Sequence, residues 1–195
     1  MGRNYFKNKN GFTISEALIA AVILLVISAI MVVSLIQGSE IWQFINSQSD
    51  LRAVAANAMT FMTQELRMAT RTSSETPSPN LTIPSKPNNK SVDFYLPADL
   101  DDNGFIFDSL GSTEWDKSNK IQYQYVPGQK QLRRLEKGDH FVIANDVELI
   151  EFEDHSIDSS LYNNELRIIL TLERATSQGR TSSITLTSIV KLRNQ

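Results

Sequence analysis

An uncharged run of twenty residues, from Ala17 to Ile36, limits the folds open to this chain more than any other feature. In an α-helix, which rises about 1.5 Å per residue, such a run spans roughly 30 Å, the thickness of the hydrocarbon core of a bilayer. Three basic residues, Arg3, Lys7 and Lys9, precede the run, and basic residues on that side favour a cytoplasmic amino terminus. The run therefore predicts one membrane-spanning helix near the start of the chain.

A secretory signal peptide or a plain signal anchor would also place an apolar run here. The apolar part of a signal peptide is usually about 7 to 15 residues long, which is shorter than this run. A signal anchor would keep the run but would give the residues before it no role. Those residues, however, contain a more specific pattern.

Gly11, Phe12 and Glu16 stand directly before the apolar run. A carboxylate at the edge of hydrocarbon is costly to bury without a partner. At these three positions the chain resembles the type IV pilin and type II secretion pseudopilin superfamily. Members of that superfamily have a short basic leader cut after a glycine, a mature chain that begins with phenylalanine, and glutamate at the fifth mature position.

The resemblance implies a role for each of these residues. A membrane-embedded prepilin peptidase would cut between Gly11 and Phe12 and methylate the new amine of Phe12. In an assembled filament, Glu16 would neutralise that amine on a neighbouring subunit, because a buried charge without a partner costs several kcal/mol. The implied partners are the prepilin peptidase, other minor and major pilins or pseudopilins that pack through the helix, and an inner-membrane assembly platform.

After Ile36 the apolar residues narrow to one face at spacings of three, four and seven, which is typical of a helix that packs against protein. No proline occurs before Pro77, so we expect one helix from Thr13 to Arg71, with Gly38 as the place for a soft bend. The segment 72–89 is rich in serine, threonine, proline and asparagine and predicts a loop. Period-two alternation then predicts strands at 92–96, 120–126, 131–136, 140–144, 147–152, 166–172 and 184–192.

These segments predict an α+β fold in which a long N-terminal helix packs its amphipathic second half on an antiparallel β-sheet head. We expect four regions: a cleaved leader at 1–11, a transmembrane and assembly helix at 12–36, the amphipathic half at 37–71, and a periplasmic head at 72–195. This outline resembles the lollipop shape of pilins and pseudopilins. The resemblance implies a single-pass protein of the inner membrane, with a cytoplasmic amino terminus and a periplasmic head, which later enters a periplasmic filament or its tip.

Within the superfamily, the later part is similar to J-type minor pseudopilins and W-type minor pilins. The similar segments are Gln64-Glu65-Leu66-Arg67, a strand pair of the form Tyr-x-Tyr and Leu-Arg-Arg, Ala144-Asn145-Asp146-Val147-Glu148, and Val190-Lys191-Leu192-Arg193-Asn194. Val33 occupies the position of the proline that kinks the helix of many major pilins, which favours a minor subunit. Glu16 disfavours the K-type tip pseudopilin, which lacks it. These patterns do not separate secretion from pilus assembly.

The composition excludes several classes of function. The net charge is -3, and the three bases of the leader leave -6 on the remainder, which disfavours nucleic-acid binding. The absence of cysteine excludes a lipoprotein anchor, disulfides and thiolate metal sites. The chain contains two histidines, His140 and His155, and no nucleophile motif or phosphate-binding glycine loop, so we expect no enzyme activity.

The segment from Asp99 to Asp108 is the candidate for a metal, although no cofactor is certain. Asp99, Asp101 and Asn103 occupy positions one, three and five of a calcium loop, and glycine follows at position six. Phe105 and Asp108 complete the candidate set. Position twelve, where such a loop has an acid, is Leu110, so a borrowed acid would have to come from Glu114 or Asp116. The alternative is a polar Asn-Gly turn between strands.

A second acidic cluster contains Glu151, Glu153, Asp154, His155 and Asp158. The cluster permits a metal site, but period-two spacing places Glu151 and Glu153 on the exposed face of a strand, where solvated charge is the usual explanation.

The sequence thus predicts a minor pilin or pseudopilin that helps to initiate or cap a type IV pilus or a type II secretion pseudopilus. The alternative is a single-pass, membrane-anchored periplasmic binding module or enzyme whose leader matches by accident.

Overall fold

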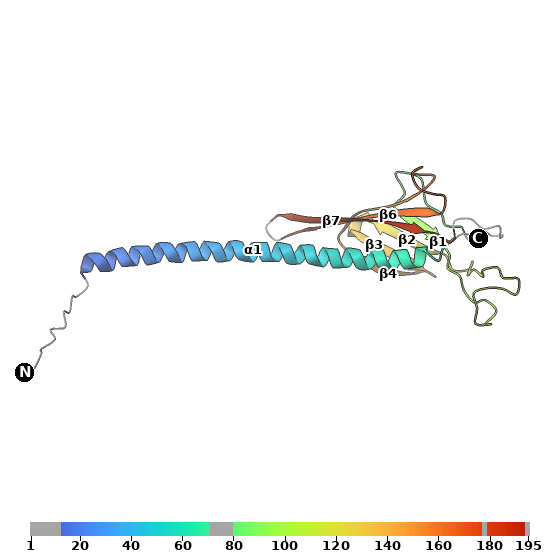
Figure 1. The fold of residues 1–195 in the computed structure, drawn as a ribbon, viewed down its shortest axis with the longest axis horizontal. Coiled ribbons are helices and arrows are strands. Elements are labelled where there is room, and N and C mark those ends of the chain that lie inside the picture. Colours follow the sequence, from blue (N-terminus) through green and yellow to red (C-terminus); the bar gives the residue numbers. More distant parts are fainter. Residues whose placement is uncertain (1–12, 71–79, 177–178, 194–195) are drawn as a thin grey trace, which may run out of the picture. The chain divides into compact units, whose positions relative to one another are not determined.

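The structure, a computed structural model, describes residues 13–70, 80–176 and 179–193 (Figure 1). The predicted leader, with Gly11 and Phe12, and residues 72–79 of the predicted 72–89 loop lie outside the described residues. The chain divides into two compact units, residues 1–45 and 46–195. Helix α1 (Ile14–Leu66) is long, at 53 residues, and the second unit contains its last part and all seven strands.

Helix α1 confirms the predicted helix and runs without a break through Val33 and Gly38. It ends at Leu66, before the predicted Arg71. The N–H groups of Met68 and Ala69 donate to carbonyls three residues earlier, which tightens the final turn. Thr70 then forms isolated bridges with Asn80 and Arg193, so the backbone leaves the helix to join extended segments.

The seven predicted strands are all present, and they form two antiparallel sheets. The first sheet has the order β1 (Ser91–Phe94), β2 (Ile121–Val126), β3 (Gln131–Glu136) and β4 (Asp139–Ala144). The second has the order β5 (Val147–Asp154), β6 (Glu165–Ala175) and β7 (Thr181–Lys191). Asp146, with φ +60°, lies between β4 and β5. β5 follows but does not pair with β4. The Val147 N–H donates to the carbonyl of Lys130, and the Phe152 N–H donates to the carbonyl of Asn89.

Strand β6 continues to Ala175 rather than Leu172, and β7 begins at Thr181 rather than Ile184. The added residues are polar or small and show no apolar alternation, so periodicity could not reveal them. In the structure Arg174 forms ion pairs with Asp50 and Asp146, which ties this end of the hairpin to α1 and to the β4–β5 connection.

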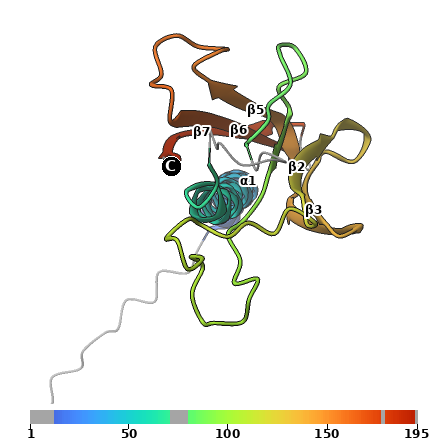
Figure 2. The same ribbon diagram turned by 90° about the vertical axis from the view of Figure 1, so that its right-hand side faces the viewer.

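The core lies between both sheets and the part of α1 that belongs to the second unit (Figure 2). From the helix, the buried residues are Leu51, Ala55, Ala58, Met59, Met62 and Leu66. From β6 they are Leu166, Ile168, Leu170 and Leu172, which alternate along the strand and therefore share its inward face. The rings of Phe94 and Tyr123 stack at 5.5 Å between centroids. The amphipathic half of the helix therefore completes the core of the head.

Candidate functional site

Thr13 and Glu16 form a capping box at the amino end of α1. The Thr13 N–H and hydroxyl each donate to Oε2 of Glu16 at 2.9 Å, and the Glu16 N–H donates to the Thr13 hydroxyl at 3.3 Å. Such reciprocal bonds satisfy helix N–H groups that have no partner within the helix, and they hold a carboxylate at the positive end of the helix dipole. Glu16 is thus fixed in place within the single chain, next to the residues that carry the predicted processing site.

The apolar part of α1 that follows has exposed side chains throughout, from Leu18 to Ile36. It makes α1 long and apolar enough to cross a membrane. The hydroxyl of Ser28 donates to the carbonyl of Leu24 at 2.8 Å, so this polar group is satisfied inside the helix. A helix whose exposed surface is almost entirely apolar requires lipid or other apolar helices around it. This surface fits a single-pass anchor.

The predicted metal segment brings three carboxylates together. Oxygens of Asp99, Asp101 and Glu114 lie within 4.8 Å of one another. Glu114 is one of the two acids that the sequence offered as a replacement for position twelve, whereas the Asp116 carboxylate accepts hydrogen bonds from Ser118. Calcium takes six to eight oxygen ligands, so three carboxylates supply part of such a shell.

Backbone hydrogen bonds already order this segment. The Asp99 carboxylate accepts from the N–H groups of Asn103 and Gly104, at 3.1 and 2.7 Å. The Asn103 side-chain carbonyl accepts from the Phe105 N–H at 2.8 Å. The Asp108 carboxylate accepts from the N–H groups of Leu110 and Ser112, so it closes a separate turn.

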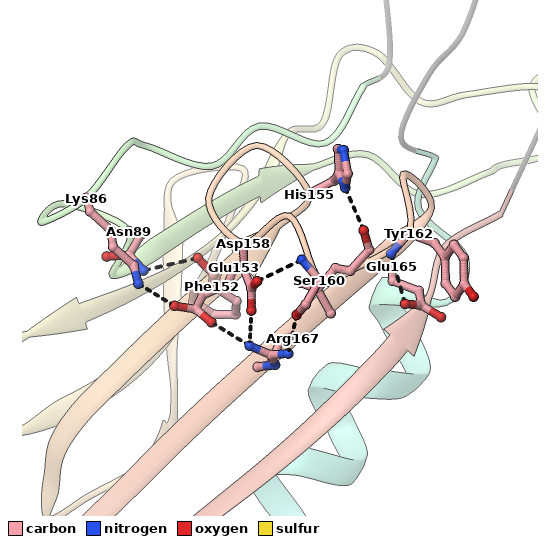
Figure 3. A network of polar contacts seen from close by, with 11 residues as sticks. Lys86, Asn89, Phe152, Glu153, His155, Asp158, Ser160, Tyr162, Glu165 and Arg167 are labelled. Carbon is pink, nitrogen blue, oxygen red and sulfur yellow. Dashed lines mark hydrogen bonds and ion pairs between the residues drawn. The ribbon is translucent and has the colours of Figure 1, made fainter.

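The acidic cluster at the end of β5 corrects one expectation. Glu153 was expected on an exposed face, but it is only 5% exposed, while Glu151 is half-buried. Figure 3 shows the reason: Lys86 contacts Oε1 of Glu153 at 2.6 Å and Arg167 contacts Oε2 at 3.2 Å. Arg167 also pairs with Asp158, whose loop covers this face of the second sheet. The carboxylates are therefore compensated by cationic side chains.

Hydrogen bonds from the backbone and side chain of Ser160, followed by the Arg167 guanidinium, lower the pKa of Asp158 from 3.8 to about 2. Another polar group of the cluster, His155 Nδ1, lies 2.6 Å from the carbonyl of Leu161. Both groups therefore serve to fix the turn between β5 and β6.

A buried ion pair that the sequence did not predict joins α1 to the first sheet. Nε of Arg134 lies 3.1 and 3.0 Å from the two carboxylate oxygens of Glu65, and the Tyr123 hydroxyl donates to the same carboxylate. Arg134 is 8% exposed. Burial, followed by the hydrogen bond to Glu65, raises the pKa of Tyr123. Glu136 also pairs with Arg134, and this bond, with one from Asn119, lowers the pKa of Glu136.

The sequence patterns described above already single out the segments that contain these residues. Glu65, Tyr123 and Arg134 belong to three of the separate segments that suggested a minor subunit, namely the helix end and the Tyr-x-Tyr and Leu-Arg-Arg strands. The structure shows that the three segments meet in one polar network.

Comparison with known proteins agrees with the amino-terminal pattern. No curated protein matches the chain, and no solved structure matches it. Residues 6–32 match the family model described as the prokaryotic N-terminal methylation motif. The chain thus carries a prepilin-type methylation motif that overlaps the start of a long apolar helix, which is consistent with a type IV pilin-like protein.

Proposed function

We propose that this protein is a minor pilin or pseudopilin that helps to initiate or cap a type IV pilus or a type II secretion pseudopilus. The methylation motif at residues 6–32, which extends into a membrane-length helix, carries the proposal. The prepilin peptidase would cut between Gly11 and Phe12, leaving an inner-membrane protein with a periplasmic head. Its function would be structural rather than enzymatic.

Glu16 supplies the assembly chemistry in this proposal. In the single chain, the Glu16 carboxylate accepts hydrogen bonds from Thr13. The carboxylate therefore has a partner before the subunit enters a filament. On entry into the filament, the amine of a neighbouring Phe12 would lie against the same carboxylate. An unpaired buried charge is strongly unfavourable, so this pairing favours one axial position of the incoming subunit.

The N-terminal residue of the mature protein tests the processing step. We expect mass spectrometry of protein from peptidase-containing cells to identify N-methylated Phe12 as the first residue. Peptidase-deficient cells should contain the chain beginning at Met1. Intact Met1 in peptidase-containing cells would contradict the proposal and favour the alternative, a membrane-anchored binding module or enzyme with an accidental motif.

Replacement of Glu16 tests the assembly step. Glu16→Ala should abolish recruitment into filaments while the amount and folding of the membrane-inserted protein stay normal. Glu40→Ala is the matched control, because it removes a carboxylate farther along the same helix. Filament incorporation equal to that of the unmodified protein would exclude the pairing role of Glu16.

We further propose that the carboxylates of Asp99, Asp101 and Glu114 bind calcium, with Asn103 and the Phe105 carbonyl as additional oxygen donors. The closeness of the three carboxylate groups supports this proposal, and Asp108 would stabilise the neighbouring turn. Because a ligand stabilises the state that binds it, calcium at 100 times its Kd should stabilise the folded protein by about 2.7 kcal/mol.

Calorimetric titration and melting curves of the full chain in detergent test the calcium site. Asp101→Asn should remove the calcium-dependent rise in Tm, and Asp139→Asn, at the start of β4, should retain it. A titration without heat and without any change in Tm would exclude the site.

A further inference from the structure

The segment from Pro97 to Asn119, here named the acidic-apolar loop, has a surface that neither the core nor the proposed anchor uses. It connects the first two strands and projects from the sheets as the yellow-green loop of Figure 2. Three large apolar side chains stand out from it: Leu100, Phe105 and Leu110 are 61%, 68% and 88% exposed. Large apolar side chains exposed on one short loop favour contact with another molecule.

The backbone of the loop is held in a defined shape. Antiparallel bridges join Pro97 to Trp115 and Phe107 to Thr113. The Asp99 and Asp108 carboxylates close two turns, as described above. Trp115, itself part of the loop, is buried. The apolar side chains are thus presented on an ordered backbone, which reduces the entropy lost on binding.

The charge of the loop restricts its partner. It contains six carboxylates and one lysine, a net charge of -5, whereas the whole chain has a net charge of -3. A bound calcium ion would leave the loop at -3. Phosphate groups of nucleic acids and anionic lipids are repelled by such a surface, whereas lysine and arginine side chains are attracted.

A cleft in the loop, lined by Leu100 among these apolar residues, can receive a basic group. Its volume is about 600 Å³, and its lining includes Leu100, Trp115, three acidic residues and one cation, Lys117, so the charged side chains of the lining sum to -2. Three of these residues are carboxylates on a wall that also includes apolar atoms. A lysine or arginine from outside would pair with the carboxylates while its neighbours contact the exposed apolar residues.

We infer that the acidic-apolar loop is the docking surface for a basic, apolar-flanked patch on the head of a neighbouring subunit of the same assembly. The choice of a filament subunit rests on the proposed function, whereas the basic and apolar character of the partner rests on the loop itself. Docking through the loop would add a head-to-head contact to the packing of the apolar helices. Such a contact would determine which subunit can pack beside this one in the assembly.

Photocrosslinking of the full chain in cells that assemble the filament tests the inference. The photoreactive residue p-benzoylphenylalanine would replace Leu110, Ile23 or Tyr162 in separate experiments. Ile23 is exposed on the apolar helix and reports packing between helices, and Tyr162 is an exposed aromatic residue outside the loop. We expect position 110 to form an adduct with another pilin-like subunit, at a head peptide that contains lysine or arginine, and position 162 to form none.

Two further variants test the chemistry of the contact. Phe105→Ser should reduce the position-110 adduct about tenfold, since loss of an aromatic side chain at the centre of an interface costs about 1.4 kcal/mol or more when that residue is a hot spot. Asp102→Asn should also weaken the adduct, because it removes charge while keeping a residue that tolerates the positive φ of 56°. Asp139→Asn, which removes an exposed charge elsewhere, should leave the adduct unchanged.

The results separate the two proposals. Adducts from position 23 without any from position 110 would overturn the docking surface and leave the filament role standing. Absence of adducts with pilin-like subunits at both positions would overturn both. An adduct of position 110 with phospholipid, with a protein outside the filament, or with a head peptide that lacks basic residues would also overturn the inference.

Discussion

At the scale of single residues, carboxylates perform distinct tasks that depend on what surrounds them. Glu16 caps the helix on which it stands, Asp99 and Asp108 close turns, and Glu153 is buried between two cations. Each task satisfies backbone N–H groups or cationic side chains that would otherwise lack a partner. Acidic residues that look alike in the sequence therefore differ in their effect on stability.

The lowered pKa of Asp158 predicts how the stability of the folded protein depends on pH in acid. Its pKa in the folded protein, about 2, lies below the ordinary 3.8, so the native state binds its proton less readily than the unfolded state. The stabilisation is therefore complete above pH 4 and is lost as the pH falls from about 4 to 2. Asp158→Asn should lower Tm at pH 6 and reduce the decline in Tm between pH 4 and 2.

Melting curves of the unmodified protein, Asp158→Asn and Asp139→Asn over this pH range provide the measurement. An equally steep decline for the unmodified protein and Asp158→Asn would show that the Ser160 and Arg167 contacts do not affect folding.

At the scale of elements, the contact between α1 and the first sheet depends on polar as well as apolar groups. Leu51, Met62 and Leu66 provide buried apolar contacts. Glu65 and Arg134 add a charge pair that must form when the helix docks, since Glu65 would otherwise be largely buried without a cation and Arg134 would keep only Glu136. The pair thus favours one rotational position of the helix on the sheet.

Breaking this pair should be costly. Glu65→Gln should lower the free energy of unfolding by about 3 kcal/mol, because it leaves the Arg134 charge poorly compensated in a buried site. Tyr123→Phe should cost about 1 to 2 kcal/mol through loss of a buried hydrogen bond. Lys130→Gln is the control, since its exposed pair with Glu148 should be worth less than about 1 kcal/mol.

Urea unfolding followed by circular dichroism measures all three variants. If Glu65→Gln and Lys130→Gln had the same small effect, the buried pair would have no special role in holding the helix.

At the scale of the whole molecule, the two compact units differ in what they need around them. The described part of unit 1–45 consists of helix with exposed apolar side chains, whereas the buried core cluster lies entirely within 46–195. The first unit therefore requires lipid or other apolar helices. The second has the apolar interior that an independent domain requires.

A fragment of residues 46–195 should therefore fold in water without detergent. Because its core is separate from the apolar run, its free energy of unfolding should match that of the head in the full chain within about 1 kcal/mol. Proton–nitrogen NMR and urea unfolding would provide the check. A fragment without dispersed amide signals would show that the first unit is needed for folding.

The sequence alone determined the membrane helix, the methylation motif and nearly all strand positions, because these features depend on local composition and on periods of two or 3.6 residues. Only the tertiary structure decided which distant residues meet. Glu65, Tyr123 and Arg134 come from three elements, and Glu114 joins Asp99 and Asp101 across the acidic-apolar loop.

The burial of Glu153 also separates what the sequence determined from what only the tertiary structure decided. Alternation along β5 predicted an exposed Glu153, yet Lys86 and Arg167, from other segments, cover it and compensate its charge. A periodic pattern reports the face of an element on which a residue lies. The exposure and partners of that residue depend on what the rest of the chain places over that face, which is a long-range property.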